Sequence, residues 1–219
     1  MLLLVRHGQS QANAAGLLLG RADSPLTELG RLQAEALGEV LASRATAACR
    51  ILTSPLQRAR QTADAIASAY AGATAHAAGS TSTTSPRALP EVSVDGRLVE
   101  LDYGELEGMA PSKLPPGLWE HWCSDATWRP PGGETLWEVT ARVSAACEEL
   151  AAEAAQGEVI VVSHVSPIKA AVAWALRAGP EVSWRLSLGV ASITRIATDG
   201  PRGPALVSFN ETDHLARLG

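Results

Sequence analysis

The feature that most limits how this chain can fold is a plan that occurs three times along it: a short apolar run, a polar turn, and then residues able to begin a helix. The apolar runs are residues 2–5, 50–53 and 159–162. Apolar runs that alternate with helices are typical of an α/β fold, in which helices cover a mostly parallel sheet. The repeated plan therefore predicts such a sheet, with these three runs among its strands.

The helices are predicted from serine-proline pairs, which suit the cap and first position of a helix, and from apolar residues at steps of three and four. Four helices follow, beginning at Ser54-Pro55 and reaching about residue 70, beginning at Ser166-Pro167 and reaching about residue 178, beginning after Thr27, and covering roughly residues 134–155. The apolar stripe of the helix after Thr27 consists of Leu29, Leu32, Ala36, Leu37, Val40 and Leu41.

Two C-terminal strands and one loop complete the outline. Residues 191–197 and 205–209 are predicted as strands on either side of a turn at Asp199-Gly200-Pro201. Residues 71–90 are rich in Ala, Gly, Ser and Thr and have almost no large apolar side chains. We therefore expect a flexible surface excursion there, inside the domain.

The charge and composition of the chain exclude several classes of protein. A formal net charge of -5 argues against a broad nucleic-acid surface, because such surfaces need clustered Lys and Arg, so an anionic ligand would need a local cationic pocket. Cys49, Cys123 and Cys147 lack the spacing of zinc sites or redox pairs, which indicates reduced thiols. The run at residues 2–5 is too short for a signal peptide, and no stretch approaches the roughly 20 apolar residues of a membrane span. We expect a cytoplasmic protein.

Cationic and imidazole side chains stand where the three predicted strands end. Arg6 and His7 follow the first run, Arg58 lies in the first turn of the next helix, and His164 follows the third run. The carboxyl ends of parallel strands meet at one edge of a sheet, where helix N-termini present backbone N–H groups. Each residue alone is explained as well by a surface strand end or a structural histidine. Their joint placement predicts a pocket for one phosphate dianion, which arginine binds through forked hydrogen bonds.

Six motifs extend this pattern in a fixed order. They are Val5-Arg6-His7-Gly8-Gln9-Ser10 with Asn13, Ser24-Pro25-Leu26-Thr27-Glu28-Leu29-Gly30, Ser54-Pro55-Leu56-Gln57-Arg58-Ala59-Arg60-Gln61-Thr62, Glu100-Leu101-Asp102-Tyr103-Gly104-Glu105-Leu106-Glu107-Gly108, Gly133-Glu134-Thr135, and Val162-Ser163-His164. In order and spacing, up to about residue 170, the chain resembles the histidine phosphatase superfamily, which includes phosphoglycerate mutases and many acid phosphatases. Val165 stands where the family more commonly has a small glycine, and this segment is most similar to the branch with α-ribazole phosphatase-like and broad acid phosphatase domains.

The resemblance implies a single phosphoglycerate mutase-like domain over residues 1–219. Its fold would be a three-layer α/β/α sandwich with a mostly parallel sheet and a lid-like insertion near residues 104–133. Contacts with phosphate or substrate are implied at Asn13, at the backbone around Gly20 and at Val165. Neither a metal nor another cofactor is implied.

For the chemistry, the resemblance makes His7 a nucleophile that forms a phosphohistidine, because a neutral imidazole nitrogen is nucleophilic near neutral pH. Arg6, Arg58 and His164 would bind the transferring group and stabilise the charge on its oxygens. Glu100 would protonate the departing alkoxide and then take a proton from the water that hydrolyses the phosphohistidine. Asp102 lies two residues away and stays an alternative proton donor, since it shares the face of Glu100 if the segment is extended.

Three functions remain open on these residues. The first is a metal-independent phosphomonoesterase that acts on a small phosphorylated metabolite, the second is phosphoryl transfer of the phosphoglycerate mutase type, and the third is a phosphate-binding module without turnover. A mutase must protect the phosphohistidine from water, and nothing in the sequence indicates that protection. The complete set of His7, His164 and Glu100 argues against a binding module. The expected partner is a small-molecule phosphate ester, without nucleic acid or membrane, and a homodimer is left open.

Four tryptophans crowd the region after the Glu100 motif: Trp119, Trp122, Trp128 and Trp137. They indicate either a packed core patch or a lid that touches substrate. Residues 110–131 contain only Lys113 and Arg129 as cations, against Glu120 and Asp125. This sparse positive charge favours a monoester with an apolar or bulky leaving group.

Overall fold

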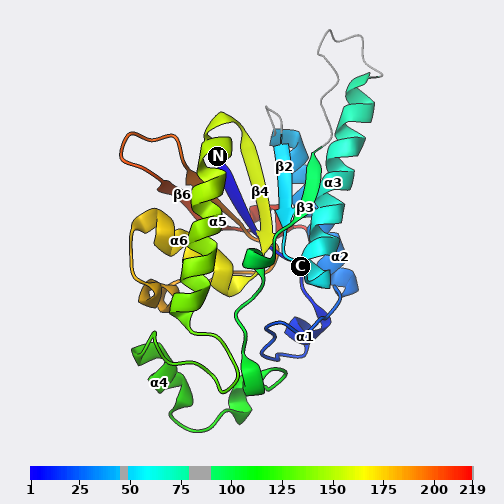
Figure 1. Cartoon of the computed structure of the whole chain (residues 1–219). Helices are drawn as coiled ribbons and strands as arrows, with labels where there is room; N and C mark the ends of the chain where they lie inside the picture. The colour runs from blue at the N-terminus through cyan, green and yellow to red at the C-terminus, as the bar shows by residue number, and fades with distance from the viewer. Residues whose placement is uncertain (45–48, 79–89, 219) are drawn as a thin grey trace.

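The computed structural model describes residues 1–44, 49–78 and 90–218 (Figure 1). Its centre is a six-stranded sheet of order β3-β2-β4-β1-β5-β6. The strands are β1 (Leu2–Arg6), β2 (Cys49–Thr53), β3 (Glu91–Val94), β4 (Glu158–Ser163), β5 (Ile193–Ala197) and β6 (Ala205–Glu211). Strands β1 to β4 are parallel, whereas β5 runs antiparallel to both β1 and β6. The mostly parallel α/β sheet predicted from the repeated plan is confirmed.

Helices cover both faces of this sheet, which gives three layers (Figure 1). They are α1 (Gln11–Ala14), α2 (Glu28–Arg44), α3 (Gln57–Ala78), α4 (Leu118–Ser124), α5 (Leu136–Gln156) and α6 (Val165–Leu176). Alternate residues of a strand point to opposite faces. Leu3 and Val5 of β1 accordingly pack in one core with α2 and α3, and Leu2 and Leu4 pack in another with α5 and α6.

Helix α2 buries a different face from the predicted stripe. Leu37 and Leu41 are buried as predicted, but Leu29 and Leu32 are 37% and 41% exposed, so these two assignments were wrong. The reason is a close approach to α3, in which a Cβ on Gly38 would lie 2.9 Å from the Cβ of Ala69. Small residues decide which side of α2 meets its neighbour.

Two helices begin at different residues from those predicted. Helix α3 begins at Gln57 rather than Pro55, and the Gln57 N–H donates to Asp23 at 2.8 Å. Helix α6 begins at Val165, with His164 as its cap residue, because the Glu100 carboxylate accepts the first N–H groups. In both cases a carboxylate distant in sequence replaces the local serine cap.

The predicted surface excursion at residues 71–90 is shorter in the structure. Helix α3 continues to Ala78, so the excursion was wrong up to that residue. Residues 79–89 lie outside the described part of the chain. Within the described part, no helix combines the length and apolar character needed to cross a membrane.

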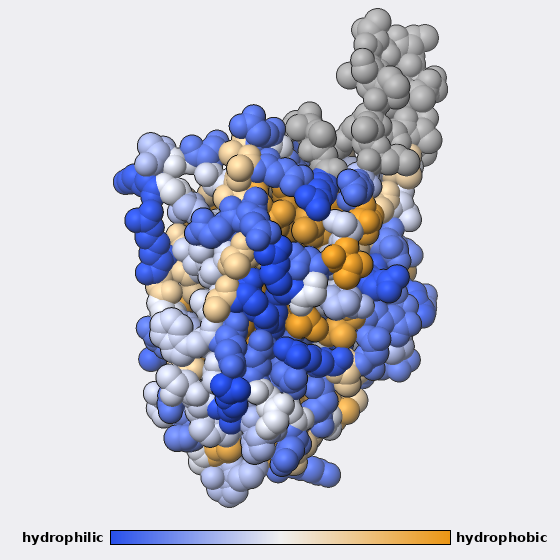
Figure 2. Space-filling model, in the orientation of Figure 1, coloured by the Kyte–Doolittle hydropathy of each residue, from blue (hydrophilic) through white to orange (hydrophobic). Residues whose placement is uncertain are grey.

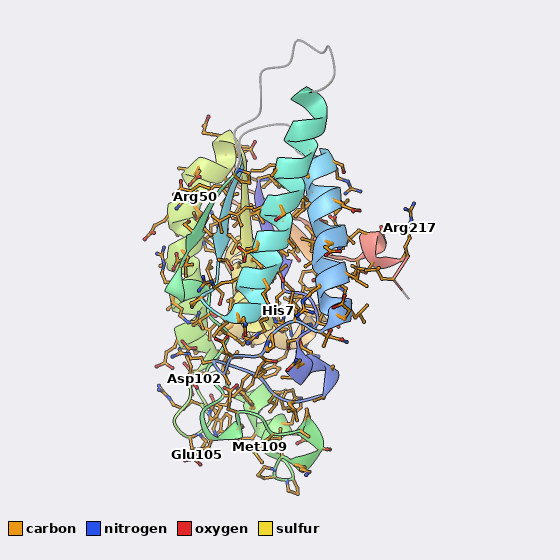
Figure 3. The ribbon with its side chains drawn as sticks, turned by 90° about the vertical axis from the view of Figure 1, so that its right-hand side faces the viewer. His7, Arg50, Asp102, Glu105, Met109 and Arg217 are labelled. Atoms are coloured by element: carbon orange, nitrogen blue, oxygen red, sulfur yellow. The ribbon has the colours of Figure 1, made fainter. Side chains whose placement is uncertain are left out.

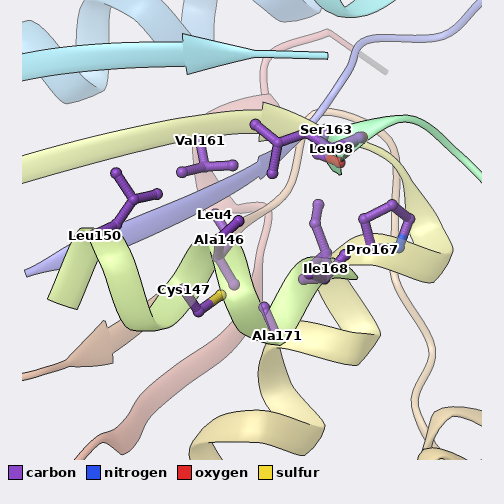
Figure 4. Close-up of a pocket in the computed structure, with 11 residues that line it drawn as sticks. Leu4, Leu98, Ala146, Cys147, Leu150, Val161, Ser163, Pro167, Ile168 and Ala171 are labelled. Carbon is purple, nitrogen blue, oxygen red and sulfur yellow. Dashed lines mark hydrogen bonds between the residues drawn. The ribbon is translucent and has the colours of Figure 1, made fainter. Parts of the chain in front are cut away.

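A small apolar cavity lies between the sheet and the helices α5 and α6 (Figure 4). Its volume is about 10 Å³, and Leu4, Val161, Cys147 and Ile168 are among its walls. Its hydroxyl-bearing wall residue, Ser163, already donates to the carbonyl of Leu98 at 2.7 Å. Burial raises the pKa of the free Cys147 thiol to about 12. The cavity is therefore a gap in the core and offers no polar group to a ligand.

The face shown in Figure 2 is mainly polar, with apolar patches over part of the sheet. At the sheet edge formed by β3, Val92 and Val94 are both exposed. The segment that carries α4 lies beyond the carboxyl ends of β1 and β4 (Figure 1). This end of the sheet is where the predicted site residues gather.

Candidate active site

The carboxyl ends of β2, β4 and β1 lie side by side, as predicted. The His7 N–H donates to the Ser163 carbonyl at 3.1 Å, and the Ser54 N–H donates to the Val162 carbonyl at 3.0 Å. These bonds continue the parallel ladder one residue past each strand, so they place His7, Ser54 and His164 in one cluster. Figure 3 shows His7 at this end of the sheet, above the loop that carries Asp102 and Glu105.

His7 is held in one orientation and is only 3% exposed. Its Nδ1 lies 2.6 Å from the Gly8 carbonyl, which can only accept, so Nδ1 carries the proton and Nε2 keeps its lone pair. Burial holds the pKa of His7 well below its usual value, and Arg58 and Arg6 lower it further. His7 is therefore a neutral imidazole, which is the form a nucleophile requires.

His164 faces His7, with ring centroids 5.0 Å apart, and is fully buried. Its Nε2 lies 2.7 Å from the Ser54 hydroxyl. That hydroxyl oxygen accepts from the Leu56 N–H, so its own proton is available to His164, which leaves Nδ1 as the protonated nitrogen. Burial lowers the pKa of His164 well below the usual value, and His7 and the two arginines act in the same direction.

Two arginines are fixed beside the histidines. Arg58 is 1% exposed and donates to the carbonyls of Gly20 at 2.7 Å and Ala22 at 3.0 Å, while Arg6 donates to the Leu188 carbonyl at 2.6 Å. Among the described residues, Arg6 Nε, Arg58 Nε and His164 Nδ1 are buried and have no hydrogen-bond partner. Leaving a buried donor unpaired costs about 1–3 kcal/mol, so three of them at one point indicate a site for an anion.

Glu100 lies on the α6 side of this cluster and is 4% exposed. Its carboxylate accepts from the N–H groups of Leu101 at 2.7 Å and of Val165 and Ser166 at 3.1 Å each. Asp102, the alternative proton donor, instead accepts from the Gly104 N–H at 2.9 Å and pairs with Arg21 at 3.3 Å. The geometry therefore favours Glu100 over Asp102 for chemistry beside His164.

The three further contacts implied by the resemblance are less free to bind phosphate. The Gly20 N–H donates to Glu107 at 2.7 Å, and the Val165 N–H is the one that Glu100 engages. Asn13 Oδ1 accepts from the Ser10 N–H at 3.1 Å within the cap of α1. Of these three implied contacts, only Asn13 offers a donor, its Nδ2 group, that has no partner among the described residues.

Two side chains that support the site could not be assigned a role from the sequence. Glu107 accepts from the N–H groups of Gly20, Arg21 and Ala22, and so holds the loop whose carbonyls bind Arg58. This residue stands inside one of the six motifs, but a carboxylate that binds backbone leaves no periodic signal.

Arg142 of α5 is the second such group. It binds Glu134 through two nitrogens, at 2.8 and 3.0 Å, and also donates to the carbonyls of Arg97 and of Glu100, the latter at 3.3 Å. It therefore clamps the segment that carries Glu100. In sequence it occupies an ordinary polar position of an amphipathic helix.

Three of the four tryptophans that the sequence placed together form a cluster in the structure, and a different tryptophan takes the place of the fourth. Trp122 is fully buried, and its ring centroid lies 5.8 Å from Trp119, 5.1 Å from Trp128 and 5.9 Å from Trp184. Trp137 is 52% exposed and makes no ring contact among the described residues, so its assignment to the group was wrong. Trp184, from the 3-10 helix Pro180–Arg185, takes its place.

No three histidine, cysteine, aspartate or glutamate side chains in the described ranges come together as metal ligands.

Comparisons with known proteins address the family and the fold of the chain. A family model described as histidine phosphatase superfamily (branch 1) matches residues 2–212. A glucosyl-3-phosphoglycerate phosphatase of Mycolicibacterium vanbaalenii is 33% identical over 208 residues, which cover 90% of this chain and 83% of the relative. The solved structure of a mycobacterial glucosyl-3-phosphoglycerate phosphatase with VO3 superposes with a TM-score of 0.81 at 29% identity, covering 96% of this chain and 99% of that one.

A bifunctional protein of Mycobacterium tuberculosis is 36% identical over 220 residues, which are 98% of this chain but 54% of that protein. The chain thus spans about half the length of this curated relative.

Proposed function

Because the chain belongs to branch 1 of the histidine phosphatase superfamily, we propose that it is a phosphomonoesterase that hydrolyses a small phosphorylated metabolite through a phosphohistidine on His7. The observation that carries the proposal is a group of buried nitrogen atoms beside His7 that have no hydrogen-bond partner among the described residues. Arg6 Nε, Arg58 Nε and His164 Nδ1 are buried donors without partners among the described residues, next to a neutral imidazole whose Nε2 keeps its lone pair. A phosphoryl group bound beside His7 would offer acceptor oxygens to these three nitrogens.

In the first half-reaction, His7 Nε2 forms a bond to phosphorus while the bond from phosphorus to the ester oxygen breaks. Arg6, Arg58 and His164 stabilise the negative charge on the three equatorial oxygens. In the step that we propose, a protonated Glu100 gives its proton to the departing oxygen, and the alcohol leaves neutral.

In the second half-reaction, water attacks the phosphorus of the phosphohistidine. Glu100, now a carboxylate, takes a proton from that water as the bond from phosphorus to Nε2 breaks. Inorganic phosphate leaves, and His7 returns to its neutral form with the proton still on Nδ1. One carboxyl serves both halves.

The substrate class follows in outline from the relatives. The relative from Mycolicibacterium vanbaalenii is named for a phosphorylated glycerate that carries a sugar, and the superposed mycobacterial structure has the same name. These names support a small phosphate ester as the substrate of this chain. The partner that we propose is accordingly a small molecule.

The test is hydrolysis of p-nitrophenyl phosphate by the wild-type chain and by His7→Asn, with His121→Asn as the matched control. His121 is exposed, and its ring meets that of Trp128 edge-on. We expect His7→Asn to lose at least about a thousandfold in kcat/KM, since the nucleophile is gone. His121→Asn should keep the wild-type value. Full activity in His7→Asn would refute the mechanism.

A second readout detects the intermediate itself. The wild-type chain, quenched during turnover of a radiolabelled ester, should carry a label that is stable to alkali and lost in acid, as expected for phosphohistidine. A label on serine or aspartate would contradict the proposal. With phosphoglycerate as substrate, hydrolysis predicts free phosphate, whereas an isomer would favour mutase activity. Tight phosphate binding without turnover of any ester would favour a binding module.

A further inference from the structure

A second pocket, of about 290 Å³, borders the phosphate site. Leu101, Val165 and Ser166 line it, and these are the residues whose N–H groups bind the Glu100 carboxylate. The oxygen that receives a proton from Glu100 is the one bonded to the alcohol part of the ester. The alcohol part of a bound substrate would therefore extend into this pocket.

Four aromatic side chains line this pocket. Trp119, Trp122, Trp184 and Tyr103 all line the pocket, and Trp122 makes edge-on contacts with the other three. Of these rings, Trp122 is buried, whereas Trp119 reaches the surface and is 43% exposed. Rings that support one another in this way present flat apolar faces, against which an aromatic ring or the apolar face of a sugar packs.

One charged side chain, Lys169, is among the residues that line the pocket. It lies one turn after Val165 on α6, so the two side chains share a face of the helix. Lys169 is half-buried and has no hydrogen bond or ion pair within the described residues. Burial lowers its pKa, and Glu100 opposes this effect while Arg6 adds to it. Glu120 and Arg185 lie close enough to act on Cys123 of the wall, but neither lines the pocket.

We propose that this pocket binds the alcohol part of the substrate and that Lys169 binds a carboxylate on that alcohol. The proposal rests on the proposed function, because it assigns the leaving group of that hydrolysis. One ammonium group matches one negative charge, which favours a carboxylate over a second phosphate dianion. The volume lies near the lower end of small-molecule pockets, about 300 Å³, which suits a single ring. The preferred substrates are therefore ring-sized phosphomonoesters whose alcohol is also a carboxylic acid.

The test compares phenyl phosphate with 4-carboxyphenyl phosphate, which differ by one carboxylate. The wild-type chain should prefer the carboxylated ester by about tenfold or more in kcat/KM, as one charge-assisted hydrogen bond predicts, and mainly through KM. The Lys169→Met variant should lose this preference, whereas the Lys169→Arg variant should keep part of it. Lys113→Met is the matched control, because Lys113 is exposed, lies outside the pocket and is the other lysine of the chain. It should keep the wild-type preference.

Two outcomes would overturn the assignment. If Lys169→Met keeps the wild-type preference, Lys169 does not bind the carboxylate. If Lys169→Met loses the same factor on both esters, Lys169 acts on the phosphoryl group or on Glu100 instead.

Binding of 4-hydroxybenzoate, measured by calorimetry, separates this assignment from the proposed function because it needs no turnover. His7→Asn should bind this alcohol, and the double variant with Lys169→Met should bind it about tenfold more weakly. If the wild-type chain hydrolyses no ester but the binding of 4-hydroxybenzoate depends on Lys169, the proposed function is refuted and the assignment of the pocket stands. Ester hydrolysis with equal binding by both variants would refute the pocket alone.

Discussion

The two buried histidines should make the stability of the chain fall steeply as the pH is lowered. His7 and His164 both have pKa values well below the usual one, because burial and the neighbouring arginines oppose their charged forms. In the unfolded chain each would bind a proton near pH 6.5. Below that pH the unfolded state therefore holds more protons than the folded state. Stability rises with pH wherever this is so.

The size of the effect follows from that difference. Each histidine that stays neutral in the folded chain removes about 1.4 kcal/mol for each pH unit below about 6.5. Between about pH 7.5 and about pH 5.5, the two together should lower the free energy of unfolding by about 3 kcal/mol. The stabilisation that depends on the two neutral histidines is fully present above about pH 6.5. It is lost progressively as the pH falls, until the pH reaches the folded-state pKa values.

The assay is urea unfolding, followed by tryptophan fluorescence, at both pH values. Buffers must be free of phosphate, because a ligand of the folded state raises its apparent stability. Relative to the wild-type chain, His7→Asn should recover about half of the loss assigned to the two histidines, and His7→Asn combined with His164→Asn should recover nearly all of it. His214, whose pKa is also lowered by burial, adds the same loss in every variant and cancels in these differences. An equal loss in the wild-type chain and the double variant would refute the reasoning.

Three shorter predictions concern the scaffold of the site. Arg142→Met should lower the free energy of unfolding by about 3 kcal/mol in urea, because it leaves the Glu134 carboxylate with the partly exposed Arg21 and one long hydrogen bond from the Asp102 N–H, at 3.4 Å. Gly30→Ala should give a chain with a much lower Tm, since a Cβ there would lie 2.0 Å from the Gln9 carbonyl; Gly72→Ala, whose Cβ meets nothing within 4 Å, should raise the Tm slightly. Glu107→Gln should lower kcat/KM for p-nitrophenyl phosphate about tenfold or more, as it loosens the loop that holds Arg58. A Glu107→Gln chain with wild-type kinetics, or an Arg142→Met chain of wild-type stability, would contradict the structural role assigned to that residue.

The strand ends could be predicted from sequence because both signals there are local. An apolar run identifies a strand, and the residue after it lies at the carboxyl edge of a parallel sheet whatever the order of the strands. These two local signals are enough to predict that His7 and His164 lie together. Glu100 came only from the resemblance, since it lies in an irregular segment and binds the start of a helix far along the chain.

The helix boundaries and the buried face of α2 show what local signals miss. Serine-proline pairs suggested the starts of α3 and α6, but Asp23 and Glu100, both remote in sequence, accept the first N–H groups. Leu29 and Leu32 fit a helical stripe, yet α3 approaches the side of α2 that carries Gly38. In each case a tertiary contact outweighs a propensity worth about 1 kcal/mol.

The leaving-group pocket was the least predictable part, for a related reason. Trp119 and Trp122 were suspected as a group because they are neighbours in sequence, and Trp137 was added on the same ground. Contact with Trp184 depends instead on where the 3-10 helix Pro180–Arg185 packs against α6. Lys169 lines this pocket one helical turn after Val165, and it is near enough to Glu100 for that carboxylate to oppose the lowering of its pKa. The Val165 N–H donates to the same carboxylate, so the group that serves the chemistry also lies beside the residue that we propose selects the substrate, and neither role is visible in the periodicity of α6.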